Sequence, residues 1–422
     1  MIETSRNWAG NITFGAARLH HPETVEQVQD LVARHRKLKV IGARHSFTDI
    51  ADSSEDLVSL DRFDPAIAVD AARRTVTISG NVRYEQLCGA LHRAGFALHN
   101  TASLPHITVA GACATGTHGS GDGNGSLATA VAAMEVVTGT GEVVVLSREL
   151  SGDPFDGAVV ALGGLGIVTR MTLDIQPTFD MRQDVYENLP LAQLLDHCDA
   201  IFAGGYSVSL FGDWREPRFN QLWIKRRVTD TAALDTPPVW FEATRATRQL
   251  DPVGHAADDC TGQLGIPGPW HERLPHFRMA YMPETGQELQ SEYMVPRQNA
   301  VAALQALERL RHHVAPNLQM SEVRTIAADN LWMSMFHDQA SIALHFTWKP
   351  DWPAVSRLLP LIEAELAPLG ARPHWGKLFA MPAAQVQSLY PKLPDFQRLL
   401  RTYDPEAKFR NRFLDTYIFG KE

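Results

Sequence analysis

Two stretches decide the fold: IGARHSF at residues 41–47 and TVAGACATGTHGSG at residues 108–121. In the first, a short apolar strand ends at Gly42 and leaves backbone N–H groups exposed beside Arg44, an arrangement that suits an anion such as a diphosphate. The second consists almost entirely of small residues, so its backbone amides can approach a ligand closely without a side-chain clash. Two such loops in one region indicate a dinucleotide-binding site.

Neither loop has the spacing of the two commonest nucleotide-binding motifs. Neither reads G-x-G-x-x-G between a strand and a helix, and neither reads G-x-x-x-x-G-K-[ST], so the Rossmann and P-loop interpretations have no basis in this sequence. Each loop taken alone could also be an ordinary glycine turn. The dinucleotide hypothesis therefore depends on the two loops acting together.

The segments around these loops alternate between helix and strand. Apolar residues recur at helical spacing over 25–32, and residues 38–41 form a short apolar strand. A second strand and helix follow over 76–95, and residues 136–145 are typical of a hairpin. Beyond Pro177 the pattern predicts further strands, a helix over 298–312 and a loop-rich stretch from 236 to 269. The fold class predicted is α+β.

Length, charge and cysteine content exclude several classes of protein. The chain of 422 residues is long enough for two packed domains. Its formal net charge of −9 gives no electrostatic support for a nucleic-acid or anionic-membrane partner. Residues 1–8 lack the apolar core of a signal peptide, and no apolar stretch approaches the roughly 18 residues that span a bilayer, so we expect a cytoplasmic protein. The four cysteines are widely spaced, and we expect reduced thiols.

Two strands in the second half place polar side chains on one face. Glu322 and Arg324 are two residues apart in one strand, so both leave the same face. In SIALHFTW at 341–348, the apolar residues share one face and His345 and Thr347 share the other. These groups could bind a hydroxyl-rich ligand in a water-poor pocket, or they could be the solvated faces of two amphipathic strands.

Several spaced motifs together resemble a known flavoprotein family. The sequences GARHS at 42–46, TGTHG at 115–119 and GGLGIVT at 163–169 resemble the FAD-binding domain of vanillyl-alcohol-oxidase-type flavoproteins. RPHWGK at 372–377 is similar to the His-Trp-x-Lys signature of their sugar-oxidising branch, the aldonolactone and alditol oxidases. Within that branch, TASLPH at 101–106 and SEVR at 321–324 look most like the alditol oxidases.

The resemblance implies a two-lobed PCMH-type FAD-binding domain and a cap domain with a large antiparallel sheet. We place the FAD-binding domain at 1–178, the cap at 179–371, and a segment that completes the FAD domain and active site at 372–422. It implies FAD bonded covalently through His45, with His118 in a structural place beside phosphate. The cofactor-binding residues implied are Ile41, Gly42, Ala43, Arg44, His45, Ser46, Phe47, Ser103, Thr108, Gly111, Thr115, Gly116, Thr117, His118, Gly166 and Ile167.

The resemblance also implies a catalytic set and a substrate-binding set. The catalytic residues implied are Lys377, Arg324, His345 and Glu322, and the substrate-binding residues implied are Ser103, Glu322, Arg324, His345, Thr347 and Lys377. Lys377 and Arg324 would stabilise negative charge during hydride transfer. His345 is suited by type to accept the hydroxyl proton, and Lys377 or Glu322 could do so instead. An ordinary surface lysine is the alternative interpretation of Lys377.

The activity implied is oxidation of the C1 hydroxyl of alditols such as xylitol and sorbitol, with dioxygen reduced to hydrogen peroxide. An aldonolactone oxidase or dehydrogenase is the nearest alternative, and a non-catalytic flavin-binding module is an alternative of another class. A third alternative is a cytoplasmic scaffold protein that binds no cofactor, and such a protein would be colourless. We expect a small polyol and dioxygen as partners, a monomer, and neither nucleic acid nor membrane.

We expect no metal requirement from the motifs. Residues 271–276 read HERLPH, which misses the zinc-binding H-E-x-x-H by one residue, and cysteine and histidine do not cluster along the chain.

Overall fold

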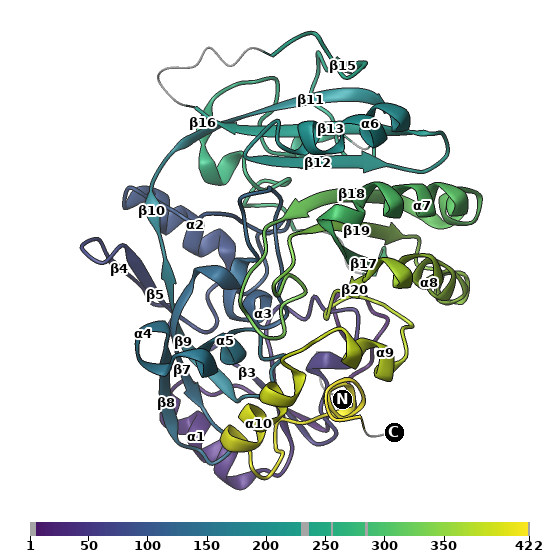
Figure 1. The fold of residues 1–422 in the computed structure, drawn as a ribbon. Helices are drawn as coiled ribbons and strands as arrows, with labels where there is room; N and C mark the ends of the chain where they lie inside the picture. Colours follow the sequence, from purple (N-terminus) through teal and green to yellow (C-terminus); the bar gives the residue numbers. More distant parts are fainter. Residues whose placement is uncertain (1–5, 229–235, 255, 283–285, 421–422) are drawn as a thin grey trace.

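The first part of the fold carries three small sheets. The computed structural model describes residues 6–228, 236–254, 256–282 and 286–420 (Figure 1). A parallel three-stranded sheet has the order β1 (Arg18–His20), β3 (Asp56–Ser59), β2 (Leu38–Ile41). An antiparallel five-stranded sheet has the order β4 (Ile67–Asp70), β5 (Thr75–Ser79), β9 (Ile167–Asp174), β7 (Val131–Val137), β8 (Val143–Ser147). A third sheet pairs β6 (Phe96–Ala97) with β10 (Gln176–Pro177).

Five α-helices pack beside these sheets, and the local sequence explains where α1 begins and which face of it is buried. They are α1 (Val25–Arg34), α2 (Tyr84–Arg93), α3 (Val109–Ala114), α4 (Arg148–Ser151) and α5 (Asp153–Val159). Thr24 begins α1 because its side chain accepts a hydrogen bond from the backbone N–H of Gln27, at 3.3 Å. Val28 and Val32 lie on one face of α1 and are completely buried against the strands.

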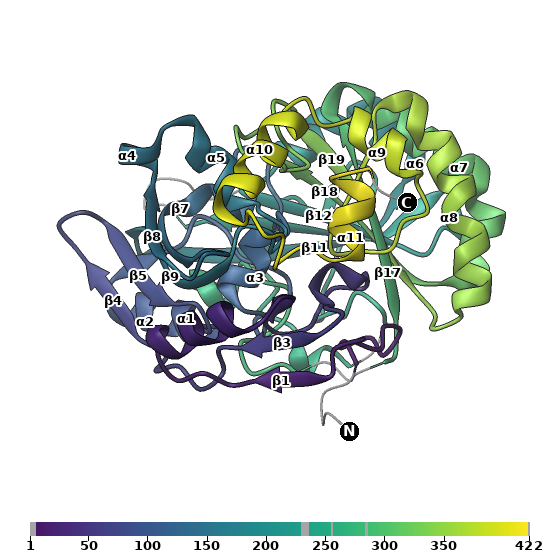
Figure 2. The ribbon, with the colours of Figure 1, turned by 90° about the horizontal axis from the view of Figure 1, so that it is seen from below.

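A ten-stranded antiparallel sheet forms the second part. Its order is β14 (Val239–Trp240), β15 (Ala243–Arg245), β11 (Asp180–Pro190), β13 (Arg218–Arg227), β12 (Ser207–Gly212), β18 (Leu318–Ile326), β19 (Ser341–Trp348), β17 (Leu289–Pro296), β20 (Arg372–Pro373), and β16 (Gly268–Pro269) pairs with β11. The helices α6 (Leu191–Phe202), α7 (Ala300–Val314) and α8 (Trp352–Leu366) lie along its outer side (Figure 2). Leu194, Leu304 and Leu359 of these helices share a buried cluster with Leu344 of β19, so one face of the sheet is apolar core.

The C-terminal segment returns to the first part of the fold. It forms α9 (Ala383–Ser388), α10 (Leu393–Tyr403) and α11 (Arg412–Tyr417). Phe396 and Phe413 are buried in the same cluster as Phe155 of α5. The buried Lys39 ammonium donates to the carbonyls of Phe409 and Leu162, at 3.1 and 3.2 Å, which joins this segment to β2.

The structure confirms the α+β prediction and most of the predicted elements. The hairpin at 136–145 is β7 and β8, the loop-rich stretch from 236 to 269 carries only short strands and 3₁₀ turns among its described residues, and the helix predicted over 298–312 begins at Ala300 and ends at Val314. All four cysteines are free and buried. In the described part of the chain, every helix is too short or too polar to cross a bilayer.

Candidate active site

One cavity of about 960 Å³ joins the two parts of the fold. The loops at 41–47 and 108–117 line one end of it, and side chains of β17, β18 and β19 line the other. The apolar core lies on the opposite face of the ten-stranded sheet, so its polar face is turned toward the cavity. The strand pattern and the glycine loops therefore converge on one site.

The glycine loops are packed tightly against each other at their end of the cavity. A Cβ atom at Gly42 would lie 2.3 Å from Oγ1 of Thr108, so only glycine allows the loop after β2 to cross the start of α3. Of the cofactor-binding residues implied by the resemblance, Gly116 and Ile167 do not line the cavity; Ile167 lies in the core against β7. The others do.

His45 projects from a sharp turn into the cavity. Arg44 has a φ of 58°, in the left-handed region, and the chain reverses there. The imidazole of His45 stacks on Trp8, with ring centroids 4.2 Å apart, and its Nε2 is buried without a hydrogen-bond partner. Burial and the neighbouring His106 lower the pKa of His45 to about 3, so the ring is neutral. A neutral, desolvated imidazole is a nucleophile with a free lone pair.

The same turn is bonded to the segment that carries Lys377. The backbone N–H of Phe47 donates to the carbonyl of Gly376 at 2.7 Å, and the Thr48 hydroxyl donates to the carbonyl of Trp375 at 3.2 Å. These bonds place the HWGK motif beside the His45 loop, although more than 300 residues separate them in the chain.

Three ionisable side chains, those of Glu322, His345 and Glu292, lie side by side on three neighbouring strands of the sheet. Glu322 of β18 and Glu292 of β17 are both register partners of His345 on β19. Side chains at paired positions of antiparallel strands leave the same face, so the row projects into the cavity. Glu322, Arg324, His345 and Thr347 are each 5% exposed or less, which excludes the interpretation of solvated strand faces.

Glu292 lies at the centre of this row of side chains. Together with Arg324, Thr347 and Lys377, the row forms what we call the polar wall of the cavity. Its Oε2 lies 2.6 Å from Nζ of Lys377, and its Oε1 lies 2.6 Å from Nη2 of Arg324. Burial alone would raise the pKa of Glu292, but Lys377, Arg324 and His118 lower it well below its usual value, so the carboxylate is ionised. One buried anion thus holds both cations of the predicted catalytic set.

Lys377 also meets His345. Its ammonium donates to Nδ1 of His345 at 2.8 Å, and Nε2 of the same ring lies 3.0 Å from the Thr347 hydroxyl. Burial and the adjacent Lys377 lower the pKa of His345 to about 3, so the ring is neutral with its Nδ1 lone pair toward the ammonium. Burial also lowers the pKa of Lys377, and Glu292 opposes that shift.

Two further buried residues, His276 and Lys225, support the Glu322 carboxylate. Nε2 of His276 lies 2.7 Å from Oε1 of Glu322, and the Lys225 ammonium donates to Nδ1 of His276 at 3.3 Å. Because Nδ1 accepts this bond, Nε2 carries the proton and donates to the carboxylate. Burial alone would raise the pKa of Glu322, but Arg324 and His276 lower it below the usual value.

Sequence reasoning missed Glu292 and His276. Glu292 belongs to the alternating stretch LQSEYMV at 289–295, where Gln290 and Glu292 share a face, so strand periodicity offered a signal for it. His276 is the last residue of the HERLPH stretch, whose spacing was compared only with a zinc-binding motif. It follows the 3₁₀ turn at Trp270–Glu272, beyond the loop-rich stretch of 236 to 269, and no periodicity there points to a site.

Comparison with known proteins matches two separate parts of the chain. The family description "FAD binding domain" matches residues 16–147, and "D-arabinono-1,4-lactone oxidase" matches residues 279–417. An alditol oxidase of Streptomyces sp. (strain IKD472) is 49% identical over 419 residues, which cover 98% of this chain and 99% of that protein. The chain belongs to the alditol oxidase family. It is an oxidoreductase with an FAD-binding domain, as the motifs predicted.

Two further matches have lower sequence identity. An L-gulono-1,4-lactone dehydrogenase of Mycobacterium tuberculosis (strain H37Rv) is 26% identical, and the match covers 96% of this chain and 97% of that protein. Among solved structures, cholesterol oxidase from B. sterolicum superposes with a TM-score of 0.79 at 15% identity, covering 98% of this chain and 96% of that one. This likeness confirms the predicted fold, a PCMH-type FAD-binding domain with an α+β cap.

The residues present fit FAD. The cavity runs continuously from the glycine loops to the polar wall, and Gly42 and Gly111 line it without side chains. The buried, unpartnered Nε2 of His45 faces the same space. The loops at 41–47 and 108–117 would hold the diphosphate and sugar portions through backbone N–H groups.

Proposed function

We propose that the protein oxidises the C1 hydroxyl of alditols such as xylitol and sorbitol to the aldose, with dioxygen as the final electron acceptor and hydrogen peroxide as a product. The observation that carries the proposal is the buried row of Glu292, His345 and Glu322 opposite the glycine loops. An alditol offers only hydroxyl groups, which need charged and polar partners in an enclosed pocket. The alditol oxidase at 49% identity supports the same substrate class.

In this proposal the polar wall binds substrate and balances charge. FAD, when bound, supplies the acceptor for the hydride that leaves C1 and passes the electron pair on to dioxygen. Glu322, Thr347 and Ser103 bind hydroxyl groups of the alditol. Lys377 and Arg324 hold positive charge in place before the reaction, so the negative charge that develops during hydride transfer is stabilised without reorganisation.

His345 accepts the hydroxyl proton in this mechanism. The substrate hydroxyl takes the place of the Lys377 N–H at Nδ1 of His345, and its proton passes to that nitrogen as the C1–H bond breaks. The imidazolium that results lies 3.8 Å from Oε2 of Glu292, and both Glu292 and Glu322 stabilise it by raising the pKa of the ring against the effect of burial. The neutral ring in the resting structure is the form this role requires.

We further propose that His45 bonds covalently to the 8α-methyl carbon of FAD. That carbon would lose one hydrogen and the imidazole its N–H, and the two electrons released would pass to the flavin and from it to dioxygen. Its ring is neutral, buried and fixed by stacking on Trp8, and its Nε2 has no competing partner. These features leave a nucleophilic nitrogen in the cofactor cavity. A covalent tether would retain the cofactor and make it a stronger oxidant.

Replacing His45 by alanine should leave FAD removable by acid precipitation, because the bonding nitrogen is gone. The wild-type pellet should stay yellow, and a flavin peptide containing residue 45 should be found by mass spectrometry. His106→Ala is the matched control, since its ring lies 5.0 Å from that of His45 but does not line the cavity. Flavin retained in the His45→Ala pellet would contradict the tether.

Substrate comparison under nitrogen tests the proposed activity. Xylitol and sorbitol should bleach the yellow protein, and subsequent aeration should restore the colour with hydrogen peroxide formed. Bleaching by L-gulono-1,4-lactone alone would assign the protein to the lactone-oxidising relatives. A yellow protein that none of these compounds bleaches would be a binding module and not an oxidase.

A further inference from the structure

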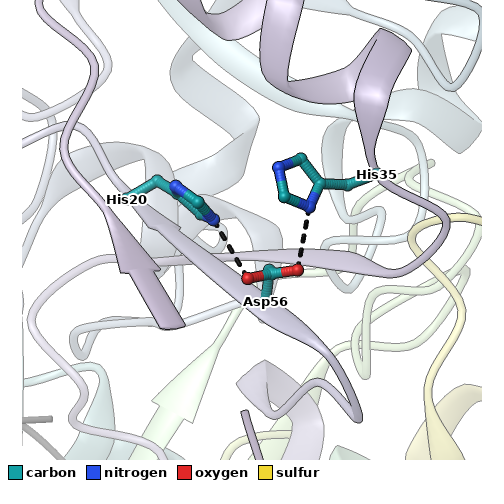
Figure 3. A group of neighbouring side chains, drawn as sticks. All are labelled: His20, His35 and Asp56. Atoms are coloured by element: carbon teal, nitrogen blue, oxygen red, sulfur yellow. Dashed lines mark hydrogen bonds and ion pairs between the residues drawn. The ribbon is translucent and has the colours of Figure 1, made fainter. Parts of the chain in front are cut away.

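A compact cluster of His20, His35 and Asp56 lies apart from the cavity, in the first part of the fold. Figure 3 shows both imidazole rings pointing a nitrogen toward the same carboxylate. Nε2 of His20 lies 3.0 Å from Oδ1 of Asp56, and Nδ1 of His35 lies 2.8 Å from Oδ2. One candidate ligand atom from each residue lies within 4.8 Å of the other two.

The three side chains are positioned by separate elements that the fold brings together. His20 ends β1, and Asp56 begins β3, which pairs in parallel with both β1 and β2. His35 terminates α1, where its backbone N–H donates to the carbonyl of Leu31 at 3.1 Å. Because a strand end, a helix end and a strand start hold the ligand atoms, the cluster is preorganised and not a chance meeting of flexible surface side chains.

The donor set and its exposure suit a divalent cation. Zinc binds imidazole nitrogen and carboxylate oxygen at about 2.0–2.2 Å and usually takes four ligands. The side chains of His20, His35 and Asp56 are 22%, 17% and 10% exposed, so water can reach the remaining position. The ring nitrogens that face Asp56 need only exchange their protons to the other ring nitrogen through solvent to offer lone pairs.

We propose that His20, His35 and Asp56 form a binding site for a divalent cation of the zinc class, with Nε2, Nδ1 and the carboxylate as ligands. The ion links the end of β1, the end of α1 and the start of β3, and it stabilises the first part of the fold by binding the native state preferentially. The site is separate from the proposed oxidation, because none of its three residues lines the cavity.

Zinc titration of the flavin-loaded protein tests this site. Untagged protein is treated with EDTA, desalted and titrated with zinc chloride against a chromogenic chelator. We expect binding that weakens at least about tenfold in His20→Ala and in His35→Ala, since even loss of a supporting hydrogen bond around a metal has an effect of that order. Zinc should also raise the unfolding temperature of the wild type and leave that of both variants unchanged.

His21→Ala is the matched control. His21 is the neighbour of His20 but pairs with Asp61 at 2.7 Å, so this variant should keep wild-type zinc affinity. A second group with metal-ligand spacing, His118, Glu292 and His374, lies in the active site, and any zinc bound there would persist in the His20 and His35 variants. Absence of zinc binding, or equal affinity in wild type and both variants, would overturn the proposal.

Discussion

The anaerobic reduction of bound FAD by xylitol should slow by roughly 10² or more when Lys377 is replaced by methionine. Methionine keeps the length and most of the volume of the side chain but removes its charge. Lys377 is the cation that contacts both Glu292 and His345, at 2.6 and 2.8 Å. Its loss removes positive charge from the site of hydride transfer and leaves Glu292 with Arg324 and His118 as neighbours.

Stopped-flow absorbance at the flavin maximum measures this rate directly and separates it from substrate affinity. Lys349→Met is the control, because Lys349 is exposed and, among the bonds described, its ammonium donates only to the carbonyl of Pro316. Flavin content and the unfolding temperature of each variant establish that the fold is retained. A Lys377→Met protein that reduces its flavin at the wild-type rate would remove this residue from the mechanism.

Glu292→Gln should both destabilise the protein and shift the pH dependence of its activity. Removing one partner from a buried ionic group costs about 3–5 kcal/mol, because the remaining charges stay buried without compensation. Here the charge left without a carboxylate partner is that of Lys377, which pairs with Glu292. Arg324 retains an ion pair, because its Nε lies 3.5 Å from Oε2 of Glu322. Denaturant unfolding of the flavin-loaded protein measures the change in free energy.

The pH shift has a definite sign. Burial lowers the pKa of Lys377 and Glu292 raises it, so neutralising Glu292 lowers that pKa further. If the protonated lysine is the active form, activity falls as pH rises through its pKa, and this fall should occur at lower pH in Glu292→Gln than in the wild type. A profile whose alkaline limb does not move would contradict this positioning role.

Glu363→Gln provides the matched control for Glu292→Gln. Glu363 is also a buried glutamate beside β17, but its Oε1 accepts from the hydroxyl of Tyr293 at 2.8 Å and from the N–H of Ala380 at 2.7 Å, which are neutral donors. Burial raises the pKa of Glu363 above its usual value. Since no cation is left uncompensated, Glu363→Gln should destabilise the protein less and leave the alkaline limb in place.

Local patterns in the sequence were sufficient to predict which residues share a face. Strand geometry alternates side chains strictly, so Glu322 with Arg324, and His345 with Thr347, could be paired from their spacing alone. The glycine loops were recognisable because close backbone approach demands small residues, and the structure places Gly42 where a Cβ would meet Thr108. The likeness of spaced motifs then indicated the flavoprotein fold.

The sequence did not predict which strands pair with each other in the sheet. Glu292 stands beside His345 because β17, β19 and β18 pair in that order, although β17 precedes β18 in the chain. His276 reaches Glu322 from a stretch without periodicity, and the cluster of His20, His35 and Asp56 forms only when β1 pairs with β3.

The sequence by itself determined the α+β class, the cofactor loops and the polar faces of two strands, because each depends on neighbours a few residues apart. Tertiary structure alone decided which anion holds Lys377, which group supports Glu322, and that His45 and Lys377 meet at one cavity. Those relations depend on strand order and loop packing between residues that are 46 positions apart for His276 and Glu322 and 85 apart for Glu292 and Lys377, and local spacing carries no information about them.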